Sequence, residues 1–336
     1  MLNTRVVVTQ YGGSEVLNTI VEPLRMPQKG ELRIKVQSAG VALADIMRRE
    51  GVYPLSPTPP FTPGYDIVGV VDELGEGMRQ YSKGERVGAF FDGTGGYSAY
   101  VYATPKDIFP VPESIDAAQA VAVILNYVTA YQMLHRIAKV SEGENILIHG
   151  ASGGVGSALL ELGKLANVNM FGTASLGKHS SVSQFGATPI DYRNDDFVQV
   201  LDRLVPEGMD AVFDPVGGAN WQRSFQTLGK KGRFVGYGYT SVLGNANRDN
   251  WVNDWSVLSE TKQTDKGNPA FLYSITALRK ENPDWFREDV GLLFSLLEQG
   301  KINPAISHRI PLSEAAYAQQ LLEKSLSIGK VVLIGL

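Results

Sequence analysis

Apolar and polar residues alternate in short runs over the first third of the chain. Residues 32–37 alternate strictly, which is typical of a strand with one buried face. Glycine- and proline-rich turns separate further short β-type runs at residues 67–74, 86–91 and 98–103. This pattern predicts a compact, mostly β domain.

Near residue 115 the pattern changes. Residues 117–138 are apolar and alanine-rich, which predicts a long helix, continuous or broken once. Strand-type runs then alternate with amphipathic helical runs such as residues 154–167; the strand-type runs are at residues 145–149, 168–173, 209–213 and 233–237. Strands that alternate with helices predict a parallel sheet covered on both faces.

The last third is mixed. We expect a helix at residues 283–299, a strand at 304–311 and a closing strand at 329–334. Ser313 is predicted to cap a further helix, with Glu314 in its first turn.

One irregular stretch, residues 242–268, contains Trp251 and Trp255 among polar residues. Its length favours a functional loop or lid. A surface helix at residues 251–261 that packs the two tryptophans is the other interpretation, and the pattern leaves both open.

Length and charge narrow the classes of partner. The chain has 336 residues, which suits about two domains. It has 31 Lys and Arg against 35 Asp and Glu, a formal net charge of −4. This balance gives no general attraction to nucleic acid or anionic lipid, so we expect neither nucleic acid nor a membrane as a partner.

The sequence contains no cysteine and only four scattered histidines. This excludes disulfides and cysteine-bearing zinc sites, and we expect no metal site. The first residues lack the apolar segment of a signal peptide. The most apolar stretch, residues 117–134, contains Gln119, Asn126 and Gln132 and is predicted to be too polar to span a bilayer. We therefore expect a cytoplasmic protein.

The strongest local signal is a strand that runs into a glycine-rich turn and then into a helix at residues 145–157. Ala151, Gly153 and Gly156 occupy the small-residue positions of a dinucleotide-binding fingerprint: one for the tight turn, one for backbone approach to a pyrophosphate, one for close packing. The helix N-terminus supplies N–H groups to the phosphates. The predicted phosphate cradle comprises Ala151, Ser152, Gly153, Gly154, Val155 and Gly156; a glycine turn without a ligand is the structural alternative.

The residues after the next predicted strand select the cofactor. NAD sites usually place a carboxylate there to bind the ribose. Here the sequence is ASLGKHS at 174–180, which has no carboxylate. Ser175 and Lys178 instead offer a hydroxyl and a positive charge, which suits a 2′-phosphate. We predict NADPH as the cofactor, against a solvated lysine as the alternative.

Several short motifs in a shared order carry a resemblance to a known family. They are GVALAD at 40–45, GVYP at 51–54, PGYDIVG at 63–69, GERVG at 84–88, TAY at 129–131, DPVGG at 214–218 and GKVV at 329–332. With the cradle, they resemble the zinc-free medium-chain dehydrogenase/reductase family, and within it the NADPH-dependent quinone oxidoreductase group, over nearly the whole chain.

The resemblance implies an α/β protein with a GroES-like β domain and a Rossmann domain, which is a doubly wound parallel sheet. The GroES-like catalytic domain is expected at residues 1–123 and 300–336, and the Rossmann NADPH-binding domain at 124–299. The active site is expected in the cleft between them, and the strand at residues 271–275 is expected to pair across a homodimer.

The resemblance also bears on metal and substrate. Zinc-dependent relatives carry their ligands at positions that align with Ala42, Tyr65 and Leu125, none of which holds zinc. The implied reaction is hydride transfer from NADPH to a quinone or an α,β-unsaturated carbonyl. Ala42 replaces an asparagine usual in quinone reductases, which leaves the native substrate open.

Further site residues come from the resemblance. The implied cofactor contacts are Asn126, Thr129, Tyr192, Gly236, Tyr237 and Gly238. Tyr192 is alternatively a packed strand-end residue, and Lys330 either reaches the cofactor phosphates or is solvated. Tyr53 and Tyr65 are candidate hydrogen-bond or proton donors to the substrate oxygen, with apolar cleft walls and water as alternatives. Asp45 is expected to be a structural partner.

Two other functions remain open at this stage. One is reduction of a specific lipid or acyl enone, with residues 251–255 shaping the pocket. The other is an NADPH-binding protein with little turnover, a hypothesis that rests on Ala42.

Overall fold

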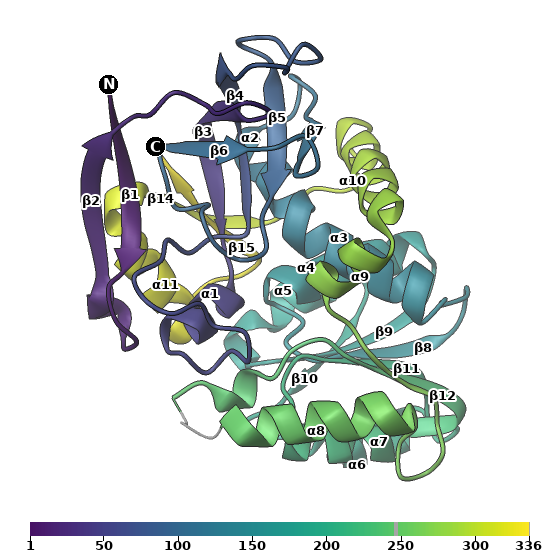
Figure 1. Cartoon of the computed structure of the whole chain (residues 1–336). Coiled ribbons are helices and arrows are strands. Elements are labelled where there is room, and N and C mark those ends of the chain that lie inside the picture. The colour runs from purple at the N-terminus through teal and green to yellow at the C-terminus, as the bar shows by residue number, and fades with distance from the viewer. Residues whose placement is uncertain (245–247, 336) are drawn as a thin grey trace. The chain divides into compact units, whose positions relative to one another are not determined.

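The computed structural model describes residues 1–244 and 248–335 and divides into two compact units (Figure 1). Unit 1 comprises Met1–Leu125 and Val290–Leu336, and unit 2 is Asn126–Asp289. The second division lies inside helix α10 (Pro283–Glu298), ten residues before the predicted one. The start of α10 belongs to unit 2 because Glu288 and Asp289 form ion pairs with Arg136.

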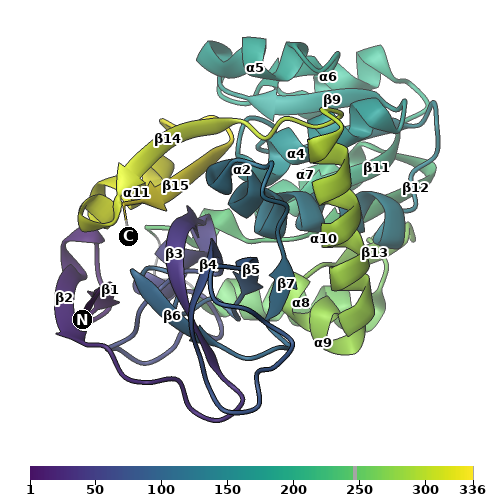
Figure 2. The same ribbon diagram turned by 90° about the horizontal axis from the view of Figure 1, so that it is seen from above.

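Unit 1 contains a seven-stranded sheet in the order β14-β15-β3-β4-β5-β7, with β6 paired to β3. The strands are β3 (Leu32–Val41), β4 (Asp66–Leu74), β5 (Arg86–Phe90), β6 (Tyr100–Ala103), β7 (Ile108–Pro110), β14 (Ile306–Pro311) and β15 (Lys330–Ile334). Because the C-terminal strand β15 pairs with β3, in antiparallel orientation, both ends of the chain contribute to this sheet. Figure 2 shows the C-terminal strands in yellow.

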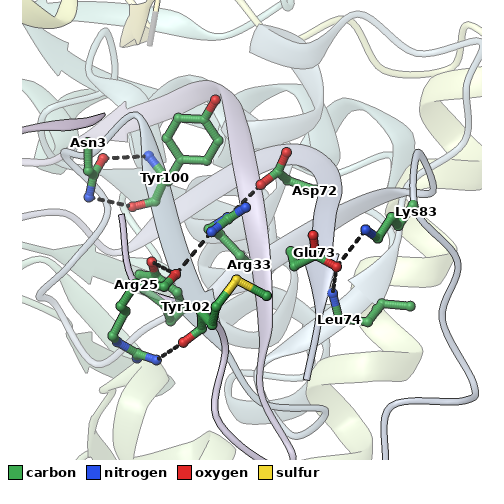
Figure 3. Close-up of polar contacts among 10 residues, drawn as sticks. Asn3, Arg25, Arg33, Asp72, Glu73, Leu74, Lys83, Tyr100 and Tyr102 are labelled. Carbon is green, nitrogen blue, oxygen red and sulfur yellow. Dashed lines mark hydrogen bonds and ion pairs between the residues drawn. The ribbon is translucent and has the colours of Figure 1, made fainter. Parts of the chain in front are cut away.

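Alternation along β3 sets its buried face. Leu32, Ile34 and Val36 are almost completely buried, as predicted. Arg33 is also buried, but its Nε lies 2.5 Å from Asp72 Oδ2 and its Nη1 donates to the Arg25 carbonyl at 3.0 Å (Figure 3). A buried guanidinium with these partners is compensated, so this part of the sheet is held by polar contacts as well as by apolar packing.

The first residues form elements that the hydrophobic pattern did not predict. Strands β1 (Leu2–Val8) and β2 (Leu17–Pro23) form an antiparallel pair, joined through the short helix η1 (Ser14–Val16). Helix α1 (Leu43–Arg49) follows β3 directly and begins at a capping arrangement in which the Ala42 N–H donates to Asp45 at 2.9 Å. This helix carries residues of the candidate site.

Unit 2 contains a six-stranded sheet in the order β10-β9-β8-β11-β12-β13, parallel throughout. The strands are β8 (Asn145–Ile148), β9 (Asn169–Ala174), β10 (Thr188–Asp191), β11 (Met209–Asp214), β12 (Leu228–Gly236) and β13 (Ala270–Leu272). In chain order this is 3-2-1-4-5-6, the arrangement of dinucleotide-binding sheets. The predicted fold class, a GroES-like domain and a Rossmann-type parallel sheet, is confirmed.

Helices cover both faces of the unit 2 sheet. Figure 1 shows α4 (Gly154–Leu165) above it and α6 (Phe197–Leu204) and α7 (Ala219–Gln226) below it. This unit also contains η4 (Leu176–Lys178), α5 (His179–Ser183), η5 (Thr240–Val242), α8 (Arg248–Thr261) and α9 (Ile275–Glu281).

The predicted long helix is one continuous run, Ala117–Ile137. It consists of α2 (Ala117–Ala122), η2 (Val123–Tyr127), α3 (Val128–Tyr131) and η3 (Gln132–Ile137), where η2 and η3 are π-helical and the helix is not broken. Its mean hydropathy of 1.2 is high enough for a membrane span by composition, which corrects the prediction that the stretch is too polar. However, 83% of the most apolar 18-residue stretch of this helix is buried, as in the core helix of a globular protein.

Three local predictions are settled by the backbone. Ser313 does not cap a helix: it lies inside the turn η6 (Leu312–Glu314), and α11 (Ala315–Glu323) follows from Glu314. Pro311, whose ring fixes φ at −57° and whose ψ is 145°, is the extended residue directly before the turn, so the turn begins at Leu312 and not after Ser313. The helix interpretation of residues 251–261 is confirmed by α8, although residues 245–247 of that stretch lie outside the described residues. The strand predicted at 271–275 is shorter, because Ser274 caps α9.

Candidate functional site

The candidate phosphate cradle lies between β8 and α4. Its tight turn is at Gly150, which has φ +64°, so the prediction that Ala151 takes this position is wrong by one residue. A side chain at φ +64° is strained, and glycine is not. Ala151 is buried, and its N–H donates to the Thr173 carbonyl at 3.0 Å, which ties the turn to β9.

Close packing at the cradle explains its other glycines. A Cβ on Gly156 would overlap the Gly150 carbonyl oxygen and the Ala151 backbone, and one on Gly153 would lie 3.3 Å from the same oxygen. Gly153 is the N-cap of α4, so the first N–H groups of the helix, from Gly154 onward, have no acceptor within the helix. Such an open helix N-terminus suits a diphosphate.

Asn126 and Thr129 come from the part of the long helix that belongs to unit 2. The Asn126 amide lies so close to Gly154 that a side chain on Gly154 would overlap it, which places Asn126 next to the cradle. Its contact with the nicotinamide stays a prediction. Thr129 is buried and hydrogen bonds with Tyr273, whose hydroxyl also donates to Gln132 Oε1 at 2.7 Å.

The edge formed by β9 and β10 carries two cations, Lys178 and Arg193, with the Asp191 carboxylate at the end of β10. The register pairs Ala174 with Asp191, so the residues after both strands lie at one edge: Ser175 and Lys178 after β9, Tyr192 and Arg193 after β10. Lys178 is half-buried, and desolvation together with the charge of Arg193 lowers its pKa. The sequence argument missed Arg193, whose signal was its place directly after a parallel neighbour strand.

A buried polar network lies beneath the cradle and was also missed. His149 Nδ1 lies 3.1 Å from Thr173 Oγ1, and His149 Nε2 lies 3.0 Å from Ser224 Oγ. Ser224 in turn donates to Asp214 at 2.7 Å. Burial lowers the pKa of His149, so a neutral imidazole links the ends of β8, β9 and β11.

The predicted residues after β12 lie at the same edge of the sheet. The Tyr237 N–H donates to the Asp214 carbonyl at 3.2 Å, and burial raises the pKa of Tyr237. A Cβ on Gly238 would lie 3.1 Å from the Pro215 carbonyl oxygen. A Cβ on Gly236, at the end of β12, would lie 2.8 Å from the Trp221 ring. These positions require small residues for packing.

Lys330 belongs to the interior of unit 1. It is 2% exposed, and its Nζ lies 3.6 Å from Asp66 Oδ2, in space left by Gly40. The interpretation of Lys330 as a solvated lysine is therefore wrong. Its contact with cofactor phosphates stays a prediction.

The two candidate tyrosines of unit 1 surround an arginine. The Tyr65 hydroxyl accepts from Arg48 Nε at 3.2 Å and Nη2 at 3.0 Å. The Arg48 Cζ lies 4.2 Å from the Tyr53 ring centroid and 5.3 Å from that of Tyr65. Both tyrosines therefore do more than line an apolar wall, and Arg48 is a residue that the sequence argument missed.

Asp45 is a structural partner, as expected. Its carboxylate accepts from the Ala42 N–H, from the Tyr97 hydroxyl at 3.0 Å and from the Gly64 N–H at 3.2 Å. Complete burial raises its pKa to about 6 in spite of these donors. The carboxylate therefore fixes the start of α1 to the neighbouring loops.

Metal-ligating side chains do not cluster within residues 1–244 and 248–335: no group of three or more His, Cys, Asp or Glu is placed to hold a metal ion. The position that aligns with a zinc-ligating histidine is the phenol of Tyr65, which is bonded to Arg48.

Comparison with known proteins agrees with this architecture. A model described as "Alcohol dehydrogenase GroES-like domain" matches residues 28–113, and one described as "Zinc-binding dehydrogenase" matches residues 185–333. The human synaptic vesicle membrane protein VAT-1 homolog is 31% identical, over 98% of this chain and 85% of that protein.

Two quinone oxidoreductases are also similar. The rat protein is 29% identical over 97% of this chain and 96% of its own length. The crystal structure of Escherichia coli quinone oxidoreductase complexed with NADPH has a TM-score of 0.86 and 27% identity, and covers 98% of this chain and 99% of that one. The matches span both units, and the chain belongs to the zinc-free medium-chain dehydrogenase/reductase family.

Proposed function

We propose that this chain is an NADPH-dependent reductase that transfers hydride to a quinone or an α,β-unsaturated carbonyl. The observation that carries the proposal is the pairing of a glycine cradle with two cations, Lys178 and Arg193, at the edge where the 2′-phosphate of NADPH is expected. The E. coli relative of known structure was crystallised with NADPH, which supports the same cofactor.

Charge selects between the two nicotinamide cofactors. A phosphate on the ribose adds negative charge, which two neighbouring cations and the Ser175 hydroxyl favour. NADH lacks this group, so Lys178 and Arg193 would gain no charge-assisted contact with its ribose. NADPH is therefore expected to bind more tightly than NADH.

The nicotinamide ring supplies the hydride when the cofactor is bound. The open N–H groups of α4 and the helix dipole would hold the diphosphate, and Asn126 and Thr129 would lie near the nicotinamide, as the family resemblance implies. Ala42, Tyr65 and Leu125 offer no zinc ligand set, so the acceptor must already be electrophilic, as quinones and enones are.

A substrate panel with both cofactors tests the proposal. NADPH oxidation should proceed with quinones or enones, and NADH should be used poorly. Oxidation with enones alone would favour the narrower function of a lipid or acyl enone reductase. Tight NADPH binding without oxidation of any acceptor would favour a binding protein and overturn the proposed activity.

We also propose a homodimer in the cytoplasm. β13 pairs with β12 on one side only and ends the sheet, and Phe271 on it is 39% exposed. An edge strand of this kind can pair with its copy across a twofold axis. Light scattering of the intact chain should give twice the mass of 36.5 kDa; a single-chain mass would contradict the dimer.

A further inference from the structure

Two adjacent buried arginines on α1 have opposite surroundings. Arg49 is 0% exposed and is neutralised: it forms ion pairs with Glu50 and Glu323 and donates to Gln319 Oε1 at 2.8 Å. Arg48 is 5% exposed, and no carboxylate among residues 1–244 and 248–335 lies within ion-pair distance of it. Buried charges are usually paired with an opposite charge. Burying Arg48 without a carboxylate therefore costs free energy of folding, and packing alone does not explain why this residue is present.

The hydrogen bonds of Arg48 are directed at one phenol. Two of its five N–H groups donate to the Tyr65 oxygen, and Nη1 donates to the Leu55 carbonyl at 2.9 Å. The Tyr53 ring covers the guanidinium at 4.2 Å, a cation–π distance. A Cβ on Gly93 would lie 2.6 Å from Arg48 Nε, so the group is held in one place from several sides.

This arrangement fixes the proton of Tyr65. Because the phenol oxygen accepts twice from Arg48, its own O–H must point away from the guanidinium. Burial raises the pKa of Tyr65 well above its usual value, although Arg48 opposes this, so the hydroxyl keeps its proton at neutral pH. The result is a phenol that donates in one direction, next to an uncompensated positive charge.

We propose that Tyr65 and Arg48 form the binding site for the carbonyl oxygen of an α,β-unsaturated carbonyl substrate and for the enolate formed from it. This inference rests on the proposed function and deepens it. Tyr65 is the donor to the oxygen, and Arg48 is the positioning residue that orients and polarises it.

The chemistry balances. The hydride, which carries the electron pair, forms a C–H bond at the β-carbon as the C=C π bond breaks. The π electrons move toward the carbonyl, and negative charge develops on its oxygen. NADPH is oxidised and the enone is reduced; the α-carbon later takes its proton from water. A donor aimed at that oxygen stabilises the charge where it develops, which is the principle of an oxyanion hole.

A nitrophenol tests the site in the intact chain without NADPH, because its ionised form mimics an enolate and absorbs visible light. The wild type should bind the ionised form preferentially. Tyr65→Phe and Arg48→Met should each weaken this binding about 10-fold or more, as expected for a lost hydrogen bond to a charged group. Arg48→Lys should restore part of it. Unchanged binding in Arg48→Met overturns the inference.

Arg49→Lys is the matched control, on the next residue of the same helix. It should lower thermal stability but leave nitrophenolate affinity unchanged. A loss of affinity equal to that of Arg48→Met would show that the effect is merely structural and would overturn the inference. If Arg48→Met does not fold, the same binding measurement on Tyr65→Phe, which removes a single oxygen atom, tests the inference instead.

Turnover separates this inference from the proposed function. In Tyr65→Phe, kcat with an enone should fall about 100-fold while KM changes little, because the contact strengthens only in the transition state. A wild type that reduces no acceptor but binds nitrophenolate through Tyr65 and Arg48 would refute the proposed function and support the site. A wild type that reduces enones with Tyr65→Phe fully active would refute the site alone.

Discussion

At the scale of single residues, some charges are buried against partners and hold the fold, while two cations lie near each other at the edge of the unit 2 sheet. Arg33 and Arg49 are buried against carboxylates, and Asp45 is buried among hydrogen-bond donors. Lys178 and Arg193 instead lie close enough for one cation to lower the pKa of the other. Like charges brought together in this way favour an anion between them.

Lys178→Ala and Arg193→Ala should each reduce cofactor discrimination. We expect about 10-fold weaker NADPH binding in each variant, because one charge-assisted hydrogen bond to the 2′-phosphate is lost. NADH binding should change little, since it lacks that phosphate. Fluorescence titration with both cofactors measures this, and an equal loss for NADH would contradict the assignment.

Asp45 should make stability depend on pH. Its pKa is raised from 3.8 to about 6 by burial, so its contribution is complete below pH 4 and is lost as the pH rises through about 6. The shift corresponds to about 3 kcal/mol. In urea unfolding, the difference between wild type and Asp45→Asn should therefore shrink by about this amount between pH 4 and pH 7; a constant difference would contradict it.

At the scale of elements, the strand–turn–helix unit β8–α4 depends on how closely the helix approaches the turn. Gly150 allows the positive φ, and Gly156 lets α4 lie directly against the Gly150 carbonyl. The His149 network then ties the end of β8 to β9 and β11. Hydrogen bonds from the ends of three strands therefore converge below one turn.

Gly156→Ala should displace α4, since the new methyl group would overlap backbone atoms of Gly150 and Ala151 in the turn. We expect a loss of about 1–3 kcal/mol in the free energy of unfolding and weaker NADPH binding. Gly291→Ala, on α10 with open space around it, is the control and should stabilise the chain by about 1 kcal/mol. Chemical denaturation of both variants measures this; equal stabilities would show that the close approach is unimportant.

At the scale of the whole molecule, the chain builds a β unit from both of its ends and inserts a dinucleotide-binding unit between them. Unit 1 carries the Tyr65–Arg48 site, and unit 2 carries the cradle and the two cations. Binding to one unit should therefore be visible as local protection of that unit.

NADPH at about 100 times its Kd should add about 2.7 kcal/mol of stability. Hydrogen exchange should show protection at residues 149–157, 175–178 and 192–193, where the cradle and the cations lie, with little change in the β1–β2 pair. Protection confined to β1 and β2 would contradict the assignment of the cofactor site.

The sequence by itself determined the periodic elements and the cradle. Alternation identified β3, and the strand–glycine–helix order identified β8 and α4, because these signals are local. The strand β13 was shorter than predicted, the Ser313 cap was wrong, and the tight turn is at Gly150. Such errors are of one or a few residues and reflect backbone detail that local patterns do not contain.

Only the tertiary structure decided which distant residues meet. Arg193 reaches Lys178 through the β9–β10 register, and Arg48 meets Tyr65, 17 residues further along the chain, through the packing of α1. Lys330 proved to be buried against Asp66 for the same reason. Burial and partnership depend on contacts between segments far apart in sequence, and no local pattern records them.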